Sequence, residues 1–379
     1  MTTLSIQKLV YGGDGLGFFE GKACFVEGAL PGETVEVEIF QSKKKFARGR
    51  MIGIVENSPH RIEPPCPYTR DCGGCQYQHV SYEEELRWKE TQVREYFERE
   101  LRVPADRTAA IRHAGNPHHY RNAVTLHGGS GGKAGFYARD NRTVMAVQHC
   151  LLAASGLDSV FSGATRIPNG EDASFRLAAD GNRVTDQELR LFQVETSGGR
   201  FWTHSRGFFQ VNLEVAGLLA AQAGLWTKPL APHVFLDLYA GAGFFGLTAG
   251  REVEELVFIE DNPYSLEALE ANLRDRKRKA QVIRGEVEVR LPDCWESLPE
   301  GKRIIFLDPP RKGMSRELGL YLGSQETAGI IYVSCHLGTL VRDLKLLLSG
   351  QRFQIQEVIP FDMFPRTKHI ETAVLLTPS

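Results

Sequence analysis

The chain has 379 residues, 42% of them hydrophobic, and is therefore long enough for two or three domains with cores of their own. Its 45 Lys and Arg residues are balanced by 47 Asp and Glu residues, and the net charge of -2 gives no general attraction to nucleic acid or to an anionic membrane. Binding to a polyanion would therefore require a local basic patch.

The N-terminal residues lack the basic and apolar regions of a signal peptide, and no apolar run approaches the ~20 residues that span a bilayer. We therefore expect a cytoplasmic protein with no membrane partner. Because the cytoplasm is reducing, the seven cysteines are not expected to form disulfides.

Residues 1–58 alternate short apolar runs with glycine-rich turns, which predicts a small β-barrel. The stretch from Lys43 to Arg50 in this segment is basic, contains Phe46 and has no acidic residue. Such a stretch is either a solvated loop or a contact for an RNA backbone, and the sequence leaves both interpretations open.

Cys66, Cys72 and Cys75 follow the barrel with the spacing C-x5-C-x2-C, and two glycines separate the last two cysteines. Thiolates at such short spacings suit either an iron-sulfur cluster or zinc, and the glycines let backbone amides approach a cluster sulfur. A fourth ligand is needed, and Cys150 is the best remaining candidate. Because zinc ribbons usually carry two paired knuckles, a cubane cluster is favoured over zinc and over inert buried thiols.

A helix is predicted from Ser81 to about Glu100, because Ser81 and Glu84 have the spacing of a capping box. The residues between 106 and 200 are glycine-rich and strand-like, with few long helical patterns.

From about Phe208 onward, helices alternate with apolar strands, which predicts a parallel, doubly wound sheet. The last two predicted strands, 353–361 and 369–376, are joined by a loop too short for a helical crossover. We expect them to form an antiparallel hairpin at the edge of the sheet, as in the seven-stranded methyltransferase variant of this fold.

Residues 241–246 read G-x-G-x-x-G after an apolar strand, which is also the pattern of a dinucleotide-binding turn. Asp237 and Asp308 would repel a diphosphate at this rim but attract a cationic ligand. S-adenosylmethionine carries a sulfonium and an ammonium group and no phosphate, and Glu260 could accept hydrogen bonds from its ribose hydroxyls. The acidic rim therefore favours S-adenosylmethionine over a nicotinamide cofactor, which remains the alternative.

Cys335 directly follows an apolar strand, and Asp308 ends another. Because open α/β sheets bind ligands at the carboxyl ends of their strands, Cys335 is a candidate nucleophile. A thiolate beside a methyl donor suits carbon 5 of a pyrimidine, which becomes nucleophilic only after addition at carbon 6. Glu371, which begins the last strand, is the candidate base for the carbon-5 proton.

Uracil is favoured over cytosine as the substrate base. Cytosine enzymes of RNA commonly carry a second cysteine directly after the acidic-proline turn, whereas Pro310 and Arg311 occupy that place in this chain.

The chain resembles the RNA uracil-5-methyltransferase family over essentially its full length. The motifs that carry the resemblance are the cysteine pattern at 66–75, Gly207 to Asn212, Leu236 to Tyr239, Leu307 to Arg311, Val333 to Cys335 and His369 to Thr372. The sequence departs from the family pattern at two places. His336 and Leu337 follow the cysteine where Asn-Pro is usual, and Phe244 stands where relatives often carry Asn.

The resemblance implies an α/β protein in which a Rossmann-like seven-stranded methyltransferase domain is combined with an OB-like barrel of the TRAM type and a central α+β iron-sulfur domain. The implied ranges are 1–58 for the barrel, 59–80 with 101–204 for the central domain, 81–100 for a helix that packs on the catalytic domain, and 205–379 for the catalytic domain.

The resemblance also implies a role for each candidate site residue. Cys335 is the nucleophile and Glu371 the base; Gln210, Tyr239, Glu260 and Asp308 bind S-adenosylmethionine; Cys66, Cys72, Cys75 and Cys150 hold a [4Fe-4S] cluster. The implied partner of the monomeric enzyme is RNA, with 23S rRNA favoured and the T-loop of tRNA as the alternative. A non-catalytic RNA-binding protein is the rival outside the enzymes.

Overall fold

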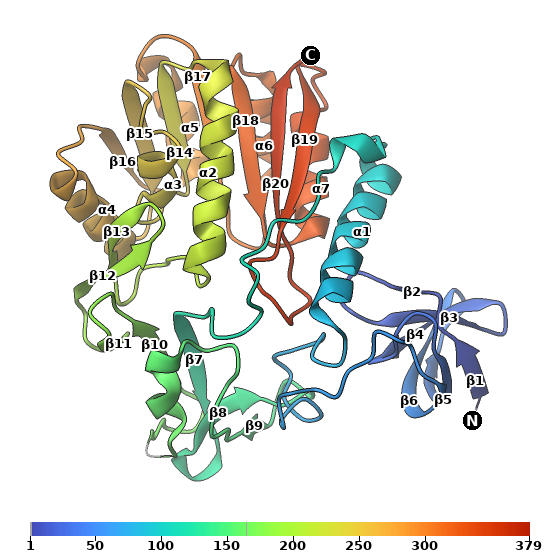
Figure 1. Cartoon of the computed structure of the whole chain (residues 1–379). Helices are drawn as coiled ribbons and strands as arrows, with labels where there is room; N and C mark the ends of the chain where they lie inside the picture. The colour runs from blue at the N-terminus through green and yellow to red at the C-terminus, as the bar shows by residue number, and fades with distance from the viewer. Residues whose placement is uncertain (1, 164) are drawn as a thin grey trace.

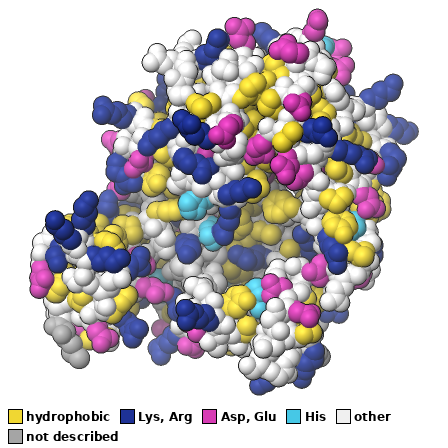
Figure 2. Space-filling model, turned by 180° about the vertical axis from the view of Figure 1, so that it is seen from behind, with side chains coloured by type: hydrophobic (Ala, Val, Ile, Leu, Met, Phe, Trp, Pro, Cys, Tyr) yellow, Lys and Arg dark blue, Asp and Glu magenta, His cyan; other side chains and the backbone are white. Residues whose placement is uncertain are grey.

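The computed structural model describes residues 2–163 and 165–379, and these residues form four β-sheets. Figure 1 shows a small N-terminal lobe, a second lobe of short strands and a larger α/β lobe. Seen from behind, the molecule is hollowed on one face, and Lys, Arg and His side chains lie in the hollow (Figure 2). Within the described residues, no helix has the length and apolar character needed to cross a membrane.

The N-terminal lobe is a six-stranded sheet with the order β1-β5-β6-β4-β3-β2. Its strands are β1 (Thr2–Ser5), β2 (Lys8–Leu9), β3 (Gly15–Phe19), β4 (Lys22–Glu27), β5 (Thr34–Ser42) and β6 (Phe46–Glu56). The inward-facing residues form a core that includes Val26, Val35 and Val37. The alternation of buried and exposed residues along β5 is the pattern expected of a strand with one solvated face.

The second lobe is built on an antiparallel sheet with the order β11-β10-β7-β8-β9. Its strands are β7 (Ala123–Gly128), β8 (Ala134–Tyr137), β9 (Val144–Met145), β10 (Asp172–Leu177) and β11 (Arg183–Thr185). A separate hairpin, β12 (Leu191–Thr196) with β13 (Gly199–His204), packs against the α/β lobe, because the backbone of Trp202 exchanges hydrogen bonds with Asn272.

The α/β lobe contains a seven-stranded sheet with the order β16-β15-β14-β17-β18-β20-β19. Its strands are β14 (Val234–Leu238), β15 (Glu255–Glu260), β16 (Gln281–Arg284), β17 (Arg303–Leu307), β18 (Gly329–Ser334), β19 (Phe353–Phe361) and β20 (Glu371–Pro378). The first five strands pair in parallel, and β20 is antiparallel to both β18 and β19. The predicted doubly wound sheet with an antiparallel edge hairpin is confirmed.

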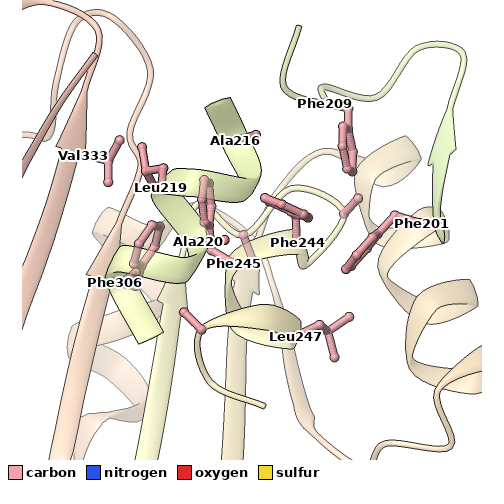
Figure 3. Packing of buried hydrophobic residues seen from close by; sticks show 14 of the residues in the cluster. Phe201, Phe209, Ala216, Leu219, Ala220, Phe244, Phe245, Leu247, Phe306 and Val333 are labelled. Atoms are coloured by element: carbon pink, nitrogen blue, oxygen red, sulfur yellow. The ribbon is translucent and has the colours of Figure 1, made fainter. Parts of the chain in front are cut away.

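Helices cover both faces of this sheet. They are α1 (Tyr82–Leu101), α2 (Leu213–Leu230), α3 (Phe244–Thr248), α4 (Pro263–Asp275), α5 (Val287–Cys294), α6 (Arg316–Ser324) and α7 (Leu337–Leu347). Alternate strand residues enter two separate cores: Phe306 lies in the core on the α2 face, whereas Leu307 lies in the core that also contains Phe97 of α1. Figure 3 shows the first of these cores, in which Phe201 and Phe209 lie close to Phe244.

Helix α1 begins where the sequence predicts, but the predicted capping box is wrong. The Ser81 side chain makes no capping hydrogen bond within the described part of the chain. The Glu84 carboxylate accepts hydrogen bonds from Arg87 Nε and Trp88 Nε1 instead, so it is not free to reach back to the helix start.

Candidate active site

Cys335 and Glu371 are brought to one edge of the sheet by neighbouring strands. Strand β18 ends at Ser334 and delivers Cys335, while the antiparallel strand β20 begins at Glu371. Ser334 pairs with Thr372, so the residue that follows one strand end lies opposite the residue that begins the other. Because adjacent strands are only ~4.8 Å apart, this register places a thiol and a carboxyl group in the same site.

Asp308 enters the same site from the end of β17. The Gln210 side chain donates a hydrogen bond from Nε2 to Asp308 Oδ2 at 3.0 Å. The Arg311 guanidinium lies on the other side and hydrogen-bonds the ring of His369 at 2.8 Å. Burial, together with Arg311, lowers the pKa of His369 to about 3, so this ring is neutral and can accept the hydrogen bond.

Burial raises the pKa of all three acidic groups of the site, which are Glu371, Asp308 and Cys335. Burial raises the pKa of Glu371 well above its ordinary value, and the Asp308 charge adds to the effect while Arg311 opposes it. Burial also raises the pKa of Asp308 to about 7. The pKa of the Cys335 thiol is raised to about 11 by burial and by Glu371, against the opposing effect of Arg311. The thiolate is therefore scarce until positive charge enters the site.

Arg311 is expected to control the reactivity of the Cys335 thiol. Replacing Arg311 by Gln removes the cation that lowers the thiol pKa, so the pKa should rise and alkylation by iodoacetamide at pH 8 should slow by about tenfold for each pKa unit. Mass spectrometry of the peptide that carries Cys335 measures the rate. Arg352→Gln, which changes an exposed arginine just before the edge strand β19, is the matched control; equal rates for all three proteins would contradict the assignment.

A cavity of about 490 Å³ lies beside this site, at the carboxyl ends of β14, β15 and β17. Tyr239 and Glu260 both line it. Glu260 is held in place by the loop, because its Oε2 accepts a hydrogen bond from Gly241 N at 2.6 Å and its Oε1 accepts one from Asn262 N at 2.8 Å. The volume suits a nucleoside-sized ligand.

The glycine loop tolerates no side chain at its third glycine. A Cβ at Gly246 would lie 2.3 Å from Phe258 and 2.9 Å from Asp237 Oδ2. Asp237 itself is 1% exposed and accepts a hydrogen bond from Gly246 N at 2.7 Å. The Asp237 carboxyl group therefore supports the loop from inside the protein, and the expectation that it faces a cationic ligand stays a prediction.

The two departures from the family pattern have structural explanations. His336 caps helix α7, since its Nδ1 accepts a hydrogen bond from Thr339 N at 3.2 Å, a role that Asn performs equally well. The Phe244 side chain is buried in the aromatic core between Phe201 and Phe209, so it belongs to the hydrophobic packing (Figure 3).

Sequence reasoning missed Tyr11, which reaches the active site from the N-terminal lobe. Its ring lies edge-on to His336 at 6.0 Å and also packs on Tyr96 at 6.3 Å. The charges of Cys335 and Arg311 both act on its phenol, which places the phenol close to them. No local signal marks this tyrosine, because the contact joins residues more than three hundred positions apart in the chain.

The four predicted cluster ligands line a single cavity of about 250 Å³. They are Cys66, Cys72, Cys75 and Cys150. No group of three or more His, Cys, Asp or Glu side chains in residues 2–163 and 165–379 is arranged to hold a single metal ion. Four cysteine thiolates are the usual ligand set of a four-iron cluster, so the thiols of this cavity have the donor chemistry that such a cluster requires.

The surroundings of the cysteines combine burial with nearby arginines. Burial raises the pKa of the Cys75 thiol to about 12 and also raises that of Cys150, whereas Arg121 opposes both shifts. Gln78 Nε2 donates a hydrogen bond to Cys75 Sγ at 3.6 Å, and Gly74 N donates one to Cys72 Sγ at 3.5 Å. Such donors are typical of sites that stabilise thiolate sulfur.

The sheet order, the glycine loop and the cavity at the strand ends define a class I methyltransferase. Family models agree: the TRAM domain matches residues 2–52, tRNA (Uracil-5-)-methyltransferase matches 301–379 and Conserved hypothetical protein 95 matches 221–326. An uncharacterized RNA methyltransferase of Bdellovibrio bacteriovorus is 31% identical over 97% of this chain and 93% of its own length. The chain belongs to the RNA uracil-5-methyltransferase family.

The names of two further similar proteins state the RNA on which each acts. The 23S rRNA (uracil(1939)-C(5))-methyltransferase RlmD of Pseudomonas putida is 26% identical over 98% of this chain and 92% of its own length. The crystal structure of Pyrococcus abyssi tRNA (uracil-54, C5)-methyltransferase with S-adenosyl-L-homocysteine is 19% identical, covers 99% of this chain and 100% of that chain, and has a TM-score of 0.74. The structural similarity supports the fold.

Proposed function

We propose that this protein methylates carbon 5 of a uridine in 23S rRNA through a transient bond between Cys335 and carbon 6 of the base. Its family membership makes it an RNA methyltransferase that uses S-adenosylmethionine. The observation that carries the finer proposal is the register of β18 and β20, which brings the Cys335 thiol and the Glu371 carboxyl group together beside a ligand-sized cavity.

In the proposed reaction, the Cys335 thiolate adds to carbon 6 of the uracil ring, and the electron pair of the double bond moves toward carbon 5 and the carbonyl oxygen. Bound S-adenosylmethionine supplies an electrophilic methyl group on a positively charged sulfur. Carbon 5 would form the new bond to that methyl group while the bond between the methyl carbon and the donor sulfur breaks, so that S-adenosylhomocysteine leaves as a neutral thioether. Glu371 then takes the carbon-5 proton, the double bond re-forms, and the Cys335 sulfur leaves carbon 6 with its electron pair.

The electrostatics of the site suit both steps. A raised pKa makes the Glu371 carboxylate a stronger base for the carbon-5 proton than an exposed glutamate would be. Arg311 opposes the raised pKa of Cys335 and is well placed to stabilise negative charge on the sulfur. The positive sulfonium of the donor would lower the pKa of Cys335 and the pKa of Glu371. The thiolate therefore forms mainly when the cofactor is present.

The pH dependence of the rate should reflect Asp308. Because the Asp308 charge raises the pKa of Glu371, replacing Asp308 by Asn should lower that pKa and move the acid limb of the kcat profile to lower pH. The limb in the parent protein should lie above the ordinary glutamate value of 4.5. Profiles are measured at saturating cofactor; an unchanged limb in Asp308→Asn would contradict the coupling.

For the cofactor, we propose that Tyr239 and Glu260 bind the nucleoside part in the cavity that they line, and that Gln210 and Asp308 lie next to its reactive end. The hydrogen bond from Gln210 to Asp308 supports this arrangement, because it fixes the Asp308 carboxyl group near both Cys335 and Glu371.

The P. putida relative supports ribosomal RNA as the substrate. The uridine must be flipped out of its stack to reach Cys335, and the hollow face with its Lys, Arg and His side chains offers a surface for the surrounding strand (Figure 2). Because the candidate site residues come from one chain, we also propose that the enzyme acts as a cytoplasmic monomer.

The test of the function uses labelled S-adenosylmethionine with 23S rRNA and with tRNA transcripts that lack modifications. We expect 5-methyluridine to form in the ribosomal transcript, at a position that digestion and mass spectrometry identify. Methylation of the tRNA alone would overturn the proposed substrate, and the absence of 5-methyluridine from both RNAs would overturn the reaction.

We propose that a [4Fe-4S] cluster is held by Cys66, Cys72, Cys75 and Cys150. The role of the cluster would be structural, because methyl transfer moves no electrons. Protein purified without oxygen should contain about four irons per chain. Cys75→Ser should lose most of this iron, and Cys294→Ser, which changes a cysteine outside the cavity, should keep it. Bound zinc, or equal iron contents in the two variants, would contradict the assignment.

A further inference from the structure

The loop that joins β19 to β20 leads directly to Glu371 and is held by buried contacts from both sides. It runs from Asp362 to Ile370, and Figure 1 shows it extending from the ends of β19 and β20 past helix α1. Arg366 has a left-handed backbone conformation with φ of 66°. A non-glycine residue persists in this conformation only where the surroundings hold it.

Helix α1 holds the first part of the loop through charged groups. Lys89 Nζ lies 2.7 Å from Asp362 Oδ1 and 2.8 Å from Glu85 Oε1, and the side chains of all three residues are 0% exposed. Lys89 Nζ also donates a hydrogen bond to the carbonyl oxygen of Phe364, and the Tyr82 hydroxyl donates one to Asp362 Oδ2 at 2.8 Å.

The segment that follows Cys75 holds the second part of the loop. Arg366 Nη1 donates hydrogen bonds to the carbonyl oxygens of Tyr77 and Val80 at 3.2 and 2.8 Å, and to Glu85 Oε2 at 3.2 Å. In return, the backbone N–H groups of Gln76 and Tyr77 donate to the carbonyl oxygen of Arg366.

These contacts form an electrically balanced unit, which we call the clamp: Glu85, Lys89, Asp362 and Arg366. It contains two cations and two anions, each at most 4% exposed. Burial alone would lower the pKa of Lys89, but the charges of Asp362 and Glu85 raise it overall. Removing one member would leave an unpaired buried charge, and the neighbouring loop is the part that can move to relieve it.

The clamp lies outside the catalytic chemistry, but it anchors the loop that leads into β20. Lys368 N donates a hydrogen bond to Gln76 Oε1 at 3.0 Å, so the loop is still attached to the cysteine segment three residues before Glu371. A displacement of about 1 Å in a general base is enough to reduce a rate strongly.

We propose that Lys89 and Arg366 are positioning residues for Glu371: by locking the loop 362–370 to helix α1 and to the segment after Cys75, they set the position from which the glutamate removes the carbon-5 proton. The inference rests on the covalent reaction proposed above. It also suggests a structural role for the cysteine site, because the segment that hydrogen-bonds Arg366 starts at the residue after Cys75.

The test compares Lys89→Met and Tyr82→Phe with Glu371→Gln. Lys345→Met is the matched control, because Lys345 also pairs with a glutamate of α1 but at the exposed surface. We expect kcat of Lys89→Met to fall by about 10- to 100-fold with KM changed by less than about threefold, and the methylated RNA–protein adduct to accumulate as it does in Glu371→Gln. In Tyr82→Phe, which removes a single hydrogen bond, kcat should fall by about threefold and the adduct should again accumulate.

Accumulation of the adduct separates positioning from a purely structural role, which would lower the amount of active enzyme without trapping an intermediate. Full activity in folded Lys89→Met, or reduced activity without adduct, overturns the inference. If Lys89→Met does not fold, the adduct level of Tyr82→Phe relative to the parent protein decides the question. Absence of adduct in Glu371→Gln itself would overturn the proposed reaction instead, so the two failures are distinguishable.

Discussion

Cys335→Ala is expected to lose methyl transfer to RNA almost completely, with a rate reduction on the order of 10⁴-fold or more. Without the sulfur, no bond to carbon 6 forms, and carbon 5 of an uncharged uracil has too little electron density to attack the methyl donor. The rate is measured from incorporation of labelled methyl groups into the ribosomal transcript. Binding of S-adenosylmethionine should be unchanged, because Tyr239 and Glu260 line the proposed cofactor cavity and Cys335 does not.

The matched control is Cys294→Ala. Cys294 is also a free, partly buried cysteine of the α/β lobe, but it lies at the end of α5 and donates its S–H to the carbonyl oxygen of Leu291. This variant should methylate at the parent rate. A Cys335→Ala protein that binds cofactor and methylates within about threefold of the parent would exclude the nucleophile.

Glu371→Gln should allow the methyl group to be transferred and then stop the reaction. The amide cannot accept the carbon-5 proton, so the Cys335 sulfur remains bonded to carbon 6 and turnover should fall by about 10²- to 10⁴-fold. Denaturing gel electrophoresis should reveal a covalent RNA–protein species that carries the labelled methyl group. The pKa of Glu371 is raised by burial and by Asp308, which gives the parent carboxylate the basicity that the amide lacks.

Glu326→Gln is the control for this variant, since Glu326 is almost fully exposed and pairs with the surface residue Arg352 at 3.5 Å. It should show parent turnover and no trapped species. If Glu371→Gln turned over normally, the base would have to be another group of the site, with Asp308 the nearest alternative.

Much of the fold follows from local signals in the sequence. The alternation of apolar strands and helices predicts the parallel sheet, and the short final loop excludes a crossover and requires the antiparallel hairpin. The same reasoning predicts that Cys335 and Glu371 share one edge of the sheet, since a strand end is a local feature and neighbouring strands are few. Sequence reasoning is reliable here because the order of the strands in the sheet determines which strand ends lie next to one another, and therefore which residues are in contact.

The errors and omissions arise where tertiary contacts override local patterns. Glu84 has the spacing of a capping residue, but the side chains of Arg87 and Trp88 engage it in the folded helix. The backbone N–H of Gly246 donates to the buried Asp237 carboxyl group, a support for the glycine loop that the sequence pattern did not indicate.

The clamp and Tyr11 show the second limit of sequence reasoning. Lys89 and Asp362 are separated by 273 positions, and Tyr11 meets His336 across an even longer stretch of chain. A charged residue on a predicted helix is ordinarily assigned to the solvated face, so the burial of Lys89 could be found only once the helix was placed against the β19–β20 loop.

The most direct test of the account uses the target RNA with 5-fluorouridine at the modified position. A base can remove the hydrogen of carbon 5 as a proton, but it cannot remove fluorine in this way. The bond between sulfur and carbon 6 should therefore persist after methyl transfer. We predict a covalent complex that forms only with S-adenosylmethionine present and that mass spectrometry maps to Cys335. An enzyme that methylates the ordinary RNA but forms no complex with the fluorinated RNA, or forms one through a different residue, would contradict the account.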